Sequence, residues 1–365
     1  MRVFTIATRF GVGGAELNSQ LLASRLNSDF SVTTKSIFIM YANGDFPENQ
    51  SCICLLPAET SNPVKLLLAF FRLLKIIYRE RPDVLIGFQP LANIFGSISV
   101  LFSKIKFIAT QRNPSSSQGK AIGYLEKLLG STGLYSANIA VSNAVIDSYS
   151  SYPASYFRKL VCVHNGFPKR PEIVPQSVAR ERFNLPQDKK IVGFLGRLAY
   201  QKYPEFLLDV VSELSMANVV LVYAGEGDEL VSLNERVTEL GLTDHVMFIG
   251  QVDFSRVFDF YDAIDVFLLP SRFEGFGRTL VEAMQSSVPV LANKLEVTQE
   301  VLSNELCVIE LNAEAWADRI RELLSNPVGY AEASDYGKER ALFFSIDNMI
   351  GGYYKVIVKA LGVRP

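Results

Sequence analysis

Short apolar runs of strand character alternate with longer helical stretches along the whole chain, and this alternation restricts the fold to parallel α/β layers. In the first half we expect strands near 2–7, 32–39, 84–88, 106–110, 138–141 and 160–163, and helices near 14–27, 63–80, 91–102, 118–130 and 143–150. In the second half we expect strands near 191–195, 218–224, 246–249, 264–269, 288–292 and 306–309, and helices near 203–216, 227–240, 253–262, 278–286, 296–303, 313–325, 329–342 and 346–361.

The chain is long enough for two domains, because 365 residues can bury two separate cores. Three prolines between Pro168 and Pro175 indicate a linker, and a new strand begins at Lys190. We therefore expect two Rossmann-like domains, 1–168 and 169–345, whose parallel sheets face each other across a cleft, followed by a closing segment at 346–365. Open parallel sheets bind ligands at the carboxyl ends of their strands, so two such domains make a shared site.

Composition narrows the class of protein. A hydrophobic content of 48% and a charged content of 20% are ordinary for a folded globular chain. The four cysteines form no Cys-x-x-Cys pair and there are only two histidines, so a zinc site or a disulfide framework is not expected and a reducing cytoplasm fits. The apolar run at Met1–Ala7 is too short for a signal peptide and indicates a first strand.

The twenty residues from Val84 to Ser103 carry no charge and are long enough to span a bilayer. Gln89, Pro90 and Asn93 interrupt this stretch. We interpret it as a strand, a turn and a buried helix, and keep a membrane span as the alternative.

The net charge of −2 hides an asymmetry. Residues 1–168 hold 16 Lys and Arg against 9 Asp and Glu, a balance of +7, whereas the remainder holds 20 against 29, a balance of −9. The two halves therefore suit different partners. An anionic membrane surface is a candidate for the first half; nucleic acid is not expected, since no aromatic and basic binding signature is present.

The segment from Ser271 to Ala283 holds the densest group of chemistry-bearing residues. Gly275 and Gly277 allow a tight loop after the strand at 264–269. A helix is expected to begin near Arg278, and its amino end suits a diphosphate. Two carboxylates, Glu274 and Glu282, flank that anion site and can accept hydrogen bonds from hydroxyl groups.

This segment resembles the E-x7-E signature of retaining GT-B glycosyltransferases, in particular glycosyltransferase family 4, with Glu274 and Glu282 matching the two glutamates. The resemblance implies a GT-B fold, with an acceptor-side first domain, a nucleotide-sugar-binding second domain and a final helix that returns to the first. It implies that Glu274 holds sugar hydroxyls and Glu282 the ribose. The remaining donor contacts would come from Gly275, Phe276, Gly277, Arg278 and Thr279.

Further matches extend the donor site. Arg197 and Lys202 follow the strand at 191–195 and resemble the family's pair of cations on the diphosphate. Fixed cations lower the barrier when negative charge builds on the β-phosphate, so no metal is needed, and the chain has no Asp-x-Asp motif. The loop with Gly13 and Gly14 resembles the glycine loop that faces the donor, and Glu226 lies in a Gly-x-Gly turn expected near the nucleotide.

The acceptor side departs from the family pattern. Many relatives have a histidine after the strand at 106–110, where this chain has Gln111 and Arg112. These two residues would face the donor sugar and the acceptor, yet neither is a good general base at neutral pH. That is consistent with a retaining reaction in which the leaving phosphate helps to deprotonate the acceptor.

The stretch from Val64 to Arg81 is aliphatic or aromatic apart from a few charged residues. Lys65, Arg72 and Arg79 recur every seven residues and share a face with Lys75. Such a helix can lie on anionic lipid. It can also be a core helix with a narrow solvated stripe, and the sequence leaves both interpretations open.

Together these features predict a metal-independent, retaining hexosyltransferase that uses a UDP- or GDP-sugar. The acceptor would be a glycan or a lipid-linked molecule in polysaccharide, lipopolysaccharide or capsule synthesis. The enzyme would be cytoplasmic, with a peripheral position on the inner leaflet of the cytoplasmic membrane as an option. Two alternatives are a nucleotide-sugar epimerase of the same architecture, disfavoured by the few histidines, and a non-catalytic nucleotide-sugar-binding subunit of an assembly complex.

Overall fold

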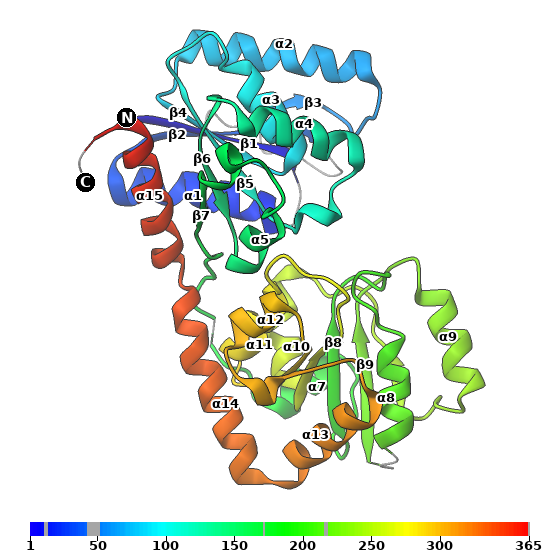
Figure 1. The fold of residues 1–365 in the computed structure, drawn as a ribbon. Helices are drawn as coiled ribbons and strands as arrows, with labels where there is room; N and C mark the ends of the chain where they lie inside the picture. The colour runs from blue at the N-terminus through cyan, green and yellow to red at the C-terminus, as the bar shows by residue number, and fades with distance from the viewer. Residues whose placement is uncertain (11–13, 42–51, 171, 215–217, 364–365) are drawn as a thin grey trace. The chain divides into compact units, whose positions relative to one another are not determined.

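The structure is a computed structural model that describes residues 1–10, 14–41, 52–170, 172–214 and 218–363. The chain forms two compact units (Figure 1). The first contains Met1–Gly166 and Ile346–Pro365, and the second contains Phe167–Ser345.

The first unit is built on a parallel sheet of seven strands in the order β3-β2-β1-β4-β5-β6-β7. The strands are β1 Arg2–Phe10, β2 Thr33–Tyr41, β3 Cys52–Leu56, β4 Val84–Phe88, β5 Lys106–Gln111, β6 Tyr135–Ala140 and β7 Leu160–Cys162. The helices are α1 Gly14–Phe30, α2 Pro63–Glu80, α3 Pro90–Ser99, α4 Lys120–Ser131, α5 Asn143–Ser148, α6 Ala154–Phe157 and α15 Ile346–Leu361. Helices α2, α3 and α4 cover one face of this sheet, and α1 and α15 cover the other (Figure 1).

Local sequence explains why α2 begins and ends where it does. The Asn62 side chain accepts a hydrogen bond from the Val64 amide at 2.9 Å, and Pro63 occupies the first helical position. Arg81 then leaves the helix in the left-handed conformation. The predicted bounds of 63–80 are confirmed.

The last helix supplies part of the first unit's core. Its side chains at Met349, Ile350, Tyr353 and Ile357 pack in one apolar cluster with residues of β1, β2, β4 and α1. The Tyr353 ring stacks on Phe88 of β4, with 6.2 Å between the ring centroids. The first core is therefore assembled from both ends of the described chain.

The second unit contains a parallel sheet of six strands in the order β10-β9-β8-β11-β12-β13. The strands are β8 Lys190–Leu195, β9 Val219–Ala224, β10 Val246–Phe248, β11 Val266–Leu269, β12 Val290–Asn293 and β13 Val308–Ile309. The helices are α7 Gln176–Arg182, α8 Phe206–Leu214, α9 Leu230–Glu239, α10 Val257–Ala263, α11 Arg278–Gln285, α12 Glu296–Leu302, α13 Ala313–Ser325 and α14 Pro327–Ala341.

The predicted pair of Rossmann-like α/β domains is confirmed, since both sheets are parallel and the first strand of each, β1 or β8, is paired on both sides. The prediction missed β3, α6 and α7. The uncharged stretch at 84–103 forms β4 and α3 as interpreted. Within the described residues, no helix combines the length and apolar character that crossing a bilayer requires.

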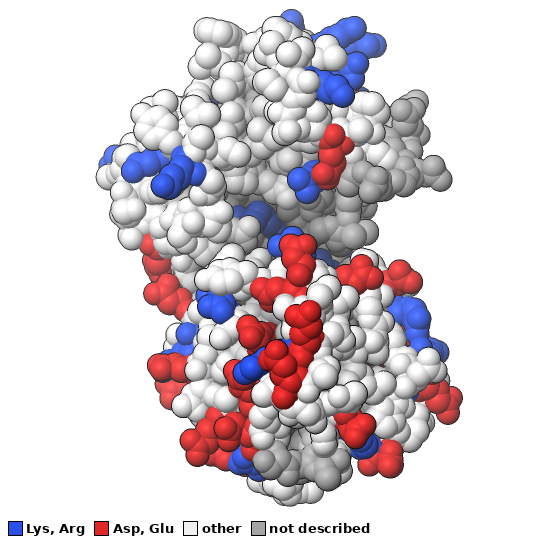
Figure 2. Space-filling model, turned by 90° about the vertical axis from the view of Figure 1, so that its right-hand side faces the viewer, with Lys and Arg blue, Asp and Glu red and all other residues white. Residues whose placement is uncertain are grey.

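The charge asymmetry is visible on the surface. On the face shown in Figure 2, Asp and Glu side chains gather on the unit formed by Phe167–Ser345. The first unit shows mainly Lys and Arg there.

Candidate functional site

The loops after β8, β9, β10, β11 and β12 lie at the carboxyl edge of the second unit's parallel sheet. The loop after β8 is joined to the loop after β9 by the Leu198 amide, which donates to the Glu226 carbonyl at 2.9 Å. The loop after β9 is joined to the one after β10, since the Gly225 amide donates to the Gly250 carbonyl at 2.7 Å. These backbone bonds fix the loops where parallel sheets bind ligands.

The glycines of the turn after β9 are required by this packing. A Cβ on Gly225, whose φ is +146°, would lie 1.9 Å from the Gly196 carbonyl oxygen. A Cβ on Gly227 would lie 2.1 Å from the Leu198 carbonyl oxygen. The Gly-x-Gly turn therefore holds the loop that carries Arg197, and Glu226 between the glycines is exposed.

An ion pair connects the loop after β8 with the loop after β11. Lys202 Nζ lies 2.5 Å from Glu274 Oε1, and the Ser271 hydroxyl donates to the same oxygen at 2.8 Å. Glu274 is only 7% exposed, so these two donors compensate for its lost hydration. Ser271 is held in turn by Asn293 at the end of β12, whose amide donates to the Ser271 carbonyl at 2.8 Å.

Arg197 differs from Lys202 in its surroundings. Its side chain is exposed, and it has no hydrogen-bond or ion-pair partner within the described part of the chain. Such a guanidinium is available to an anionic ligand at this edge of the sheet.

Helix α11 begins directly after the glycine loop. Gly277 has φ of +81°, and no side chain caps the helix at this position. Phe276 is buried and stacks on Phe167, with 5.9 Å between the ring centroids. In the first turn, the Thr279 hydroxyl oxygen is buried and has no hydrogen-bond partner. This helix start therefore has unused donor capacity, as an anion site requires.

Glu282 lies one turn further along α11 and is 5% exposed. It accepts hydrogen bonds from Arg278 Nε at 2.5 Å and from the Tyr261 hydroxyl at 3.3 Å. Burial raises the pKa of this carboxyl, whereas the Arg278 guanidinium acts in the opposite direction. The Arg278 guanidinium also lies against the rings of Phe167 and Phe254, 5.4 and 5.5 Å from their centroids.

The site residues predicted in the first unit lie in surroundings that differ from one residue to the next. Gly13 lies outside the described residues, and Gly14 is the first residue of α1. Arg112 donates to the Asn165 side chain at 2.7 Å. A pocket of about 460 Å³ lies beside the carboxyl ends of β1, β4 and β5. Its polar lining includes Arg9, Gln89, Gln111, Arg112 and Gln118.

Gln111 does not present its amide nitrogen to solvent, because this residue is almost fully buried. Its Nε2 donates to Glu126 Oε1 at 2.5 Å and lies 3.2 Å from Asn138 Oδ1. The Tyr149 hydroxyl donates to Gln111 Oε1 at 2.9 Å. Gln111 thus connects the pocket to a buried network rather than standing free in it.

Two residues that hold predicted site residues, Glu126 beside Gln111 and Tyr261 beside Glu282, were not predicted from the sequence. Glu126 is fully buried, and the Tyr156 hydroxyl contacts its two oxygens at 2.9 and 2.7 Å. Burial raises the pKa of Glu126. One sequence signal was available, because Glu126 is the only acidic residue between 84 and 146. Nothing in the sequence marks Tyr261 as a partner of Glu282.

Comparisons with known proteins show which families and folds the chain resembles. Residues 176–340 match the family model of the glycosyl transferases group 1. The chain is 30% identical over 222 residues to the D-inositol 3-phosphate glycosyltransferase of Mycobacteroides abscessus, an alignment that covers 54% of this chain and 49% of that protein. It is 33% identical over 132 residues to the lipopolysaccharide core biosynthesis mannosyltransferase LpsB of Rhizobium meliloti, covering 34% and 37%. The chain thus spans about half the length, or less, of these curated relatives.

Solved structures resemble the whole chain. Anabaena HepE in complex with UDP and glucose superposes with a TM-score of 0.84 at 17% identity, over 98% of this chain and 99% of the other. The lipopolysaccharide glycosyltransferase WaaG superposes with a TM-score of 0.75 at 13% identity, over 99% and 100%. At these identities the likeness establishes the fold, which is the GT-B fold predicted from the sequence.

Proposed function

We propose that this protein is a glycosyltransferase that moves a hexose from a nucleotide diphosphate sugar, UDP- or GDP-linked, to a hydroxyl of a glycan or lipid-linked acceptor. One observation carries the proposal. Arg197, the Lys202–Glu274 pair and the uncapped start of α11 with Glu282 gather at one edge of the second sheet. The match of residues 176–340 to the group 1 family supports the same assignment.

In this proposal each part of the site contributes to binding the donor. Arg197, Lys202 and the first turn of α11, with the Thr279 hydroxyl, bind the diphosphate. Glu282 accepts hydrogen bonds from the ribose. Glu274, fixed by Lys202 and Ser271, accepts hydrogen bonds from the sugar hydroxyls.

The reaction breaks the bond between the anomeric carbon and a β-phosphate oxygen. The bonding electrons remain on that oxygen, where Arg197 and Lys202 stabilise the added negative charge. The acceptor hydroxyl forms the new bond on the same face of the sugar, and its proton passes to the departing phosphate oxygen. The anomeric configuration is therefore retained.

We further propose that catalysis needs no metal, because two fixed cations supply positive charge at the phosphates. Turnover should be unchanged by EDTA, and addition of Mg²⁺ or Mn²⁺ should not raise it. The relatives that act in lipopolysaccharide synthesis support an acceptor in polysaccharide or glycolipid assembly.

A thermal-shift panel tests donor binding. UDP, GDP, ADP and TDP are compared on the wild type, Glu282→Gln and the control Lys338→Ala, which changes an exposed residue of α14. A nucleotide at one hundred times its dissociation constant should add about 2.7 kcal/mol of stability. One nucleotide should shift the wild type and the control, and shift Glu282→Gln much less. If no nucleotide raised the melting temperature of the wild type, the assignment of the donor site would be wrong.

Product analysis tests the chemistry. The wild type is incubated with the sugar form of the nucleotide that binds and a panel of acceptors, and the anomeric proton of the product is followed by NMR. Transfer with retained configuration is expected. An inverted product would contradict the mechanism, whereas an epimerised sugar formed without acceptor would identify an epimerase.

A further inference from the structure

The outer face of α2 exposes apolar side chains where a surface helix normally carries polar ones. Only Ala69, Leu73 and Ile77 of this helix are buried against the sheet. The opposite side forms a stripe at helical spacing of exposed Val64, Leu67, Leu68, Phe71 and Tyr78. Among these, Phe71 is 57% exposed. The helix is thus apolar on both sides, as a helix with a second apolar partner would be.

Helix α4 also exposes apolar side chains, and in addition it buries its carboxylate. Its one carboxylate, Glu126, is fully buried. Its apolar side chains point outward instead, and Tyr124 is 67% exposed. The other exposed apolar residues of this helix are Ile122, Leu125 and Leu128.

Helix α3 lies between these two and joins them into one layer. Phe95 of α3 packs edge-on against Phe70 of α2, with 5.7 Å between the ring centroids. Directly after α3, Phe102 is 87% exposed. We call the outer side of α2, α3, α4 and the loop at 101–104 the α2–α4 face.

The charged side chains of the α2–α4 face are almost all cations. Six are exposed and form no ion pair among the residues described: Lys65, Lys75, Arg79, Arg81, Lys104 and Lys120. The acidic residues between 62 and 131 are Glu80, Asp83 and Glu126. Glu80 pairs with Lys35, Asp83 accepts a hydrogen bond from the Arg2 amide, and Glu126 is buried. The face is therefore both apolar and positively charged.

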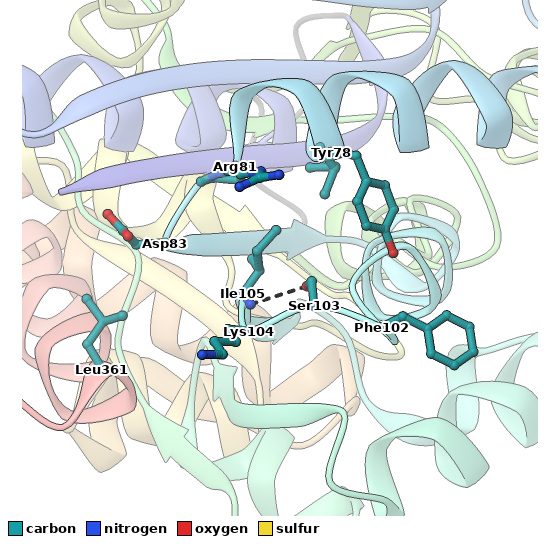
Figure 3. A pocket seen from close by; sticks show the side chains of 10 residues that line it. Tyr78, Arg81, Asp83, Phe102, Ser103, Lys104, Ile105 and Leu361 are labelled. Carbon is teal, nitrogen blue, oxygen red and sulfur yellow. Dashed lines mark hydrogen bonds between the residues drawn. The ribbon is translucent and has the colours of Figure 1, made fainter.

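A pocket of about 430 Å³ lies at one end of this face, at the amino edges of β4 and β5 (Figure 3). The rings of Tyr78 and Phe102 lie on the same side of it, and the Arg81 guanidinium points toward Tyr78. Lys104 also lines this pocket. Exposed aromatic rings next to unpaired cations are the combination that contacts the boundary between acyl chains and phosphate groups.

We propose that the α2–α4 face docks on the surface of an anionic lipid bilayer. Phe71, Phe102 and Tyr124 enter the interfacial region, and the six cations contact lipid phosphates. A bilayer explains the combination better than a second copy of the chain, because two copies of this face would oppose like charges. The proposal does not depend on the sugar-transfer chemistry, so its test uses no substrate.

Co-sedimentation with vesicles tests the proposal directly. The intact protein is mixed with vesicles of phosphatidylcholine alone, or of phosphatidylcholine with 30% phosphatidylglycerol, at low and at 0.5 M salt. Binding should be at least about tenfold stronger to the anionic vesicles and should weaken as salt rises. A wild type that stays in the supernatant with anionic vesicles at low salt would overturn the proposal.

Matched variants locate the surface. Phe71→Gln with Lys75→Glu alters the α2–α4 face, and Val328→Gln with Lys338→Glu makes the same kind of change on exposed positions of α14. The first pair should weaken vesicle binding by at least about tenfold, and the second should leave it unchanged. Equal loss in both pairs would show a general charge effect and contradict the proposal. If the protein did not bind vesicles but formed a dimer that only the first pair of substitutions dissociated, the partner of this face would be a second copy of the chain.

Insertion can be followed by fluorescence. The chain has one tryptophan, Trp316, which is fully buried and gives a constant background. In Phe102→Trp, anionic vesicles should shift the emission to shorter wavelength. An emission maximum unchanged while the protein sediments with vesicles would mean that the 101–104 loop does not insert, and this part of the proposal would fail.

Discussion

Lys202 Nζ and Glu274 Oε1 lie 2.5 Å apart although 72 positions separate the two residues in the chain. Their pairing fixes the loop after β8 against the loop after β11. Lys202 therefore has a structural role in addition to the proposed contact with phosphate. Arg197 is exposed and has no partner among the described residues, so its only role is the proposed contact with phosphate.

Replacing Lys202 should harm both stability and turnover. In Lys202→Met the buried Glu274 keeps, among the described residues, only the Ser271 hydroxyl as a partner. We expect a loss of about 3 kcal/mol in the free energy of unfolding, measured with urea. Adding Glu274→Gln should restore most of this stability without restoring turnover. If the double variant were no more stable than the single one, the ion pair would not be the cause.

Replacing Arg197 should lower turnover while leaving stability almost unchanged. Arg197→Ala removes an exposed side chain without a described partner, so the free energy of unfolding should change by less than about 0.5 kcal/mol. Turnover should fall by roughly a hundredfold or more, because one cation at the developing phosphate charge is lost. Steady-state kinetics of Arg197→Ala beside Lys338→Ala measures this difference, and near wild-type turnover would remove Arg197 from the mechanism.

A methyl group in the turn after β9 should disturb the loop that carries Arg197. Gly227→Ala places a Cβ 2.1 Å from the Leu198 carbonyl oxygen, so one of the two loops must move. The expected cost is about 1–3 kcal/mol, with weaker nucleotide binding. Gly351→Ala is the control, since nothing lies within 4 Å of its added Cβ. Equal stability of the two variants would refute the close approach.

Glu126 should make stability depend on pH. Its folded pKa is raised above the ordinary value of 4.5 because burial penalises the charged carboxylate. Between pH 4.5 and the raised value the folded state holds a proton that the unfolded state has released, so the free energy of unfolding falls as pH rises through this window.

Glu126→Gln should flatten that fall, since glutamine does not titrate. Urea unfolding of the wild type, Glu126→Gln and the exposed control Glu322→Gln from pH 4.5 to 8 measures the difference. A slope in Glu126→Gln as steep as in the wild type would exclude Glu126 as the titrating group.

The sequence was sufficient for the fold because the signals for parallel α/β structure are local. Helix α2 has a cap at Asn62 and a proline at Pro63, and its predicted bounds agree with the structure. Strand β3 was missed although Cys52–Leu56 is an unbroken apolar run, because the run is short and lies at the sheet edge, where only Leu55 and Leu56 are buried.

Most of the candidate site could be located but not its internal pairings. The spacing of Glu274 and Glu282 and the position of Lys202 after a strand are local patterns. The Lys202–Glu274 pair and the Tyr261 hydroxyl on Glu282 depend on how distant segments pack, which no local pattern reports. The inverted burial of α4 was missed for the same reason, since its sequence does not say which side meets the sheet.

Because α15 belongs to the first unit, the two units can complete their folding at different times during synthesis. The first core lacks Met349, Tyr353 and Ile357 until the ribosome has made residues that follow the entire second unit. The second unit needs only the segment from Phe167 to Ser345 and can fold while α15 is still being made. The part of the chain that emerges first is therefore expected to be the last to reach its final packing, with its apolar surface open to chaperones in the meantime.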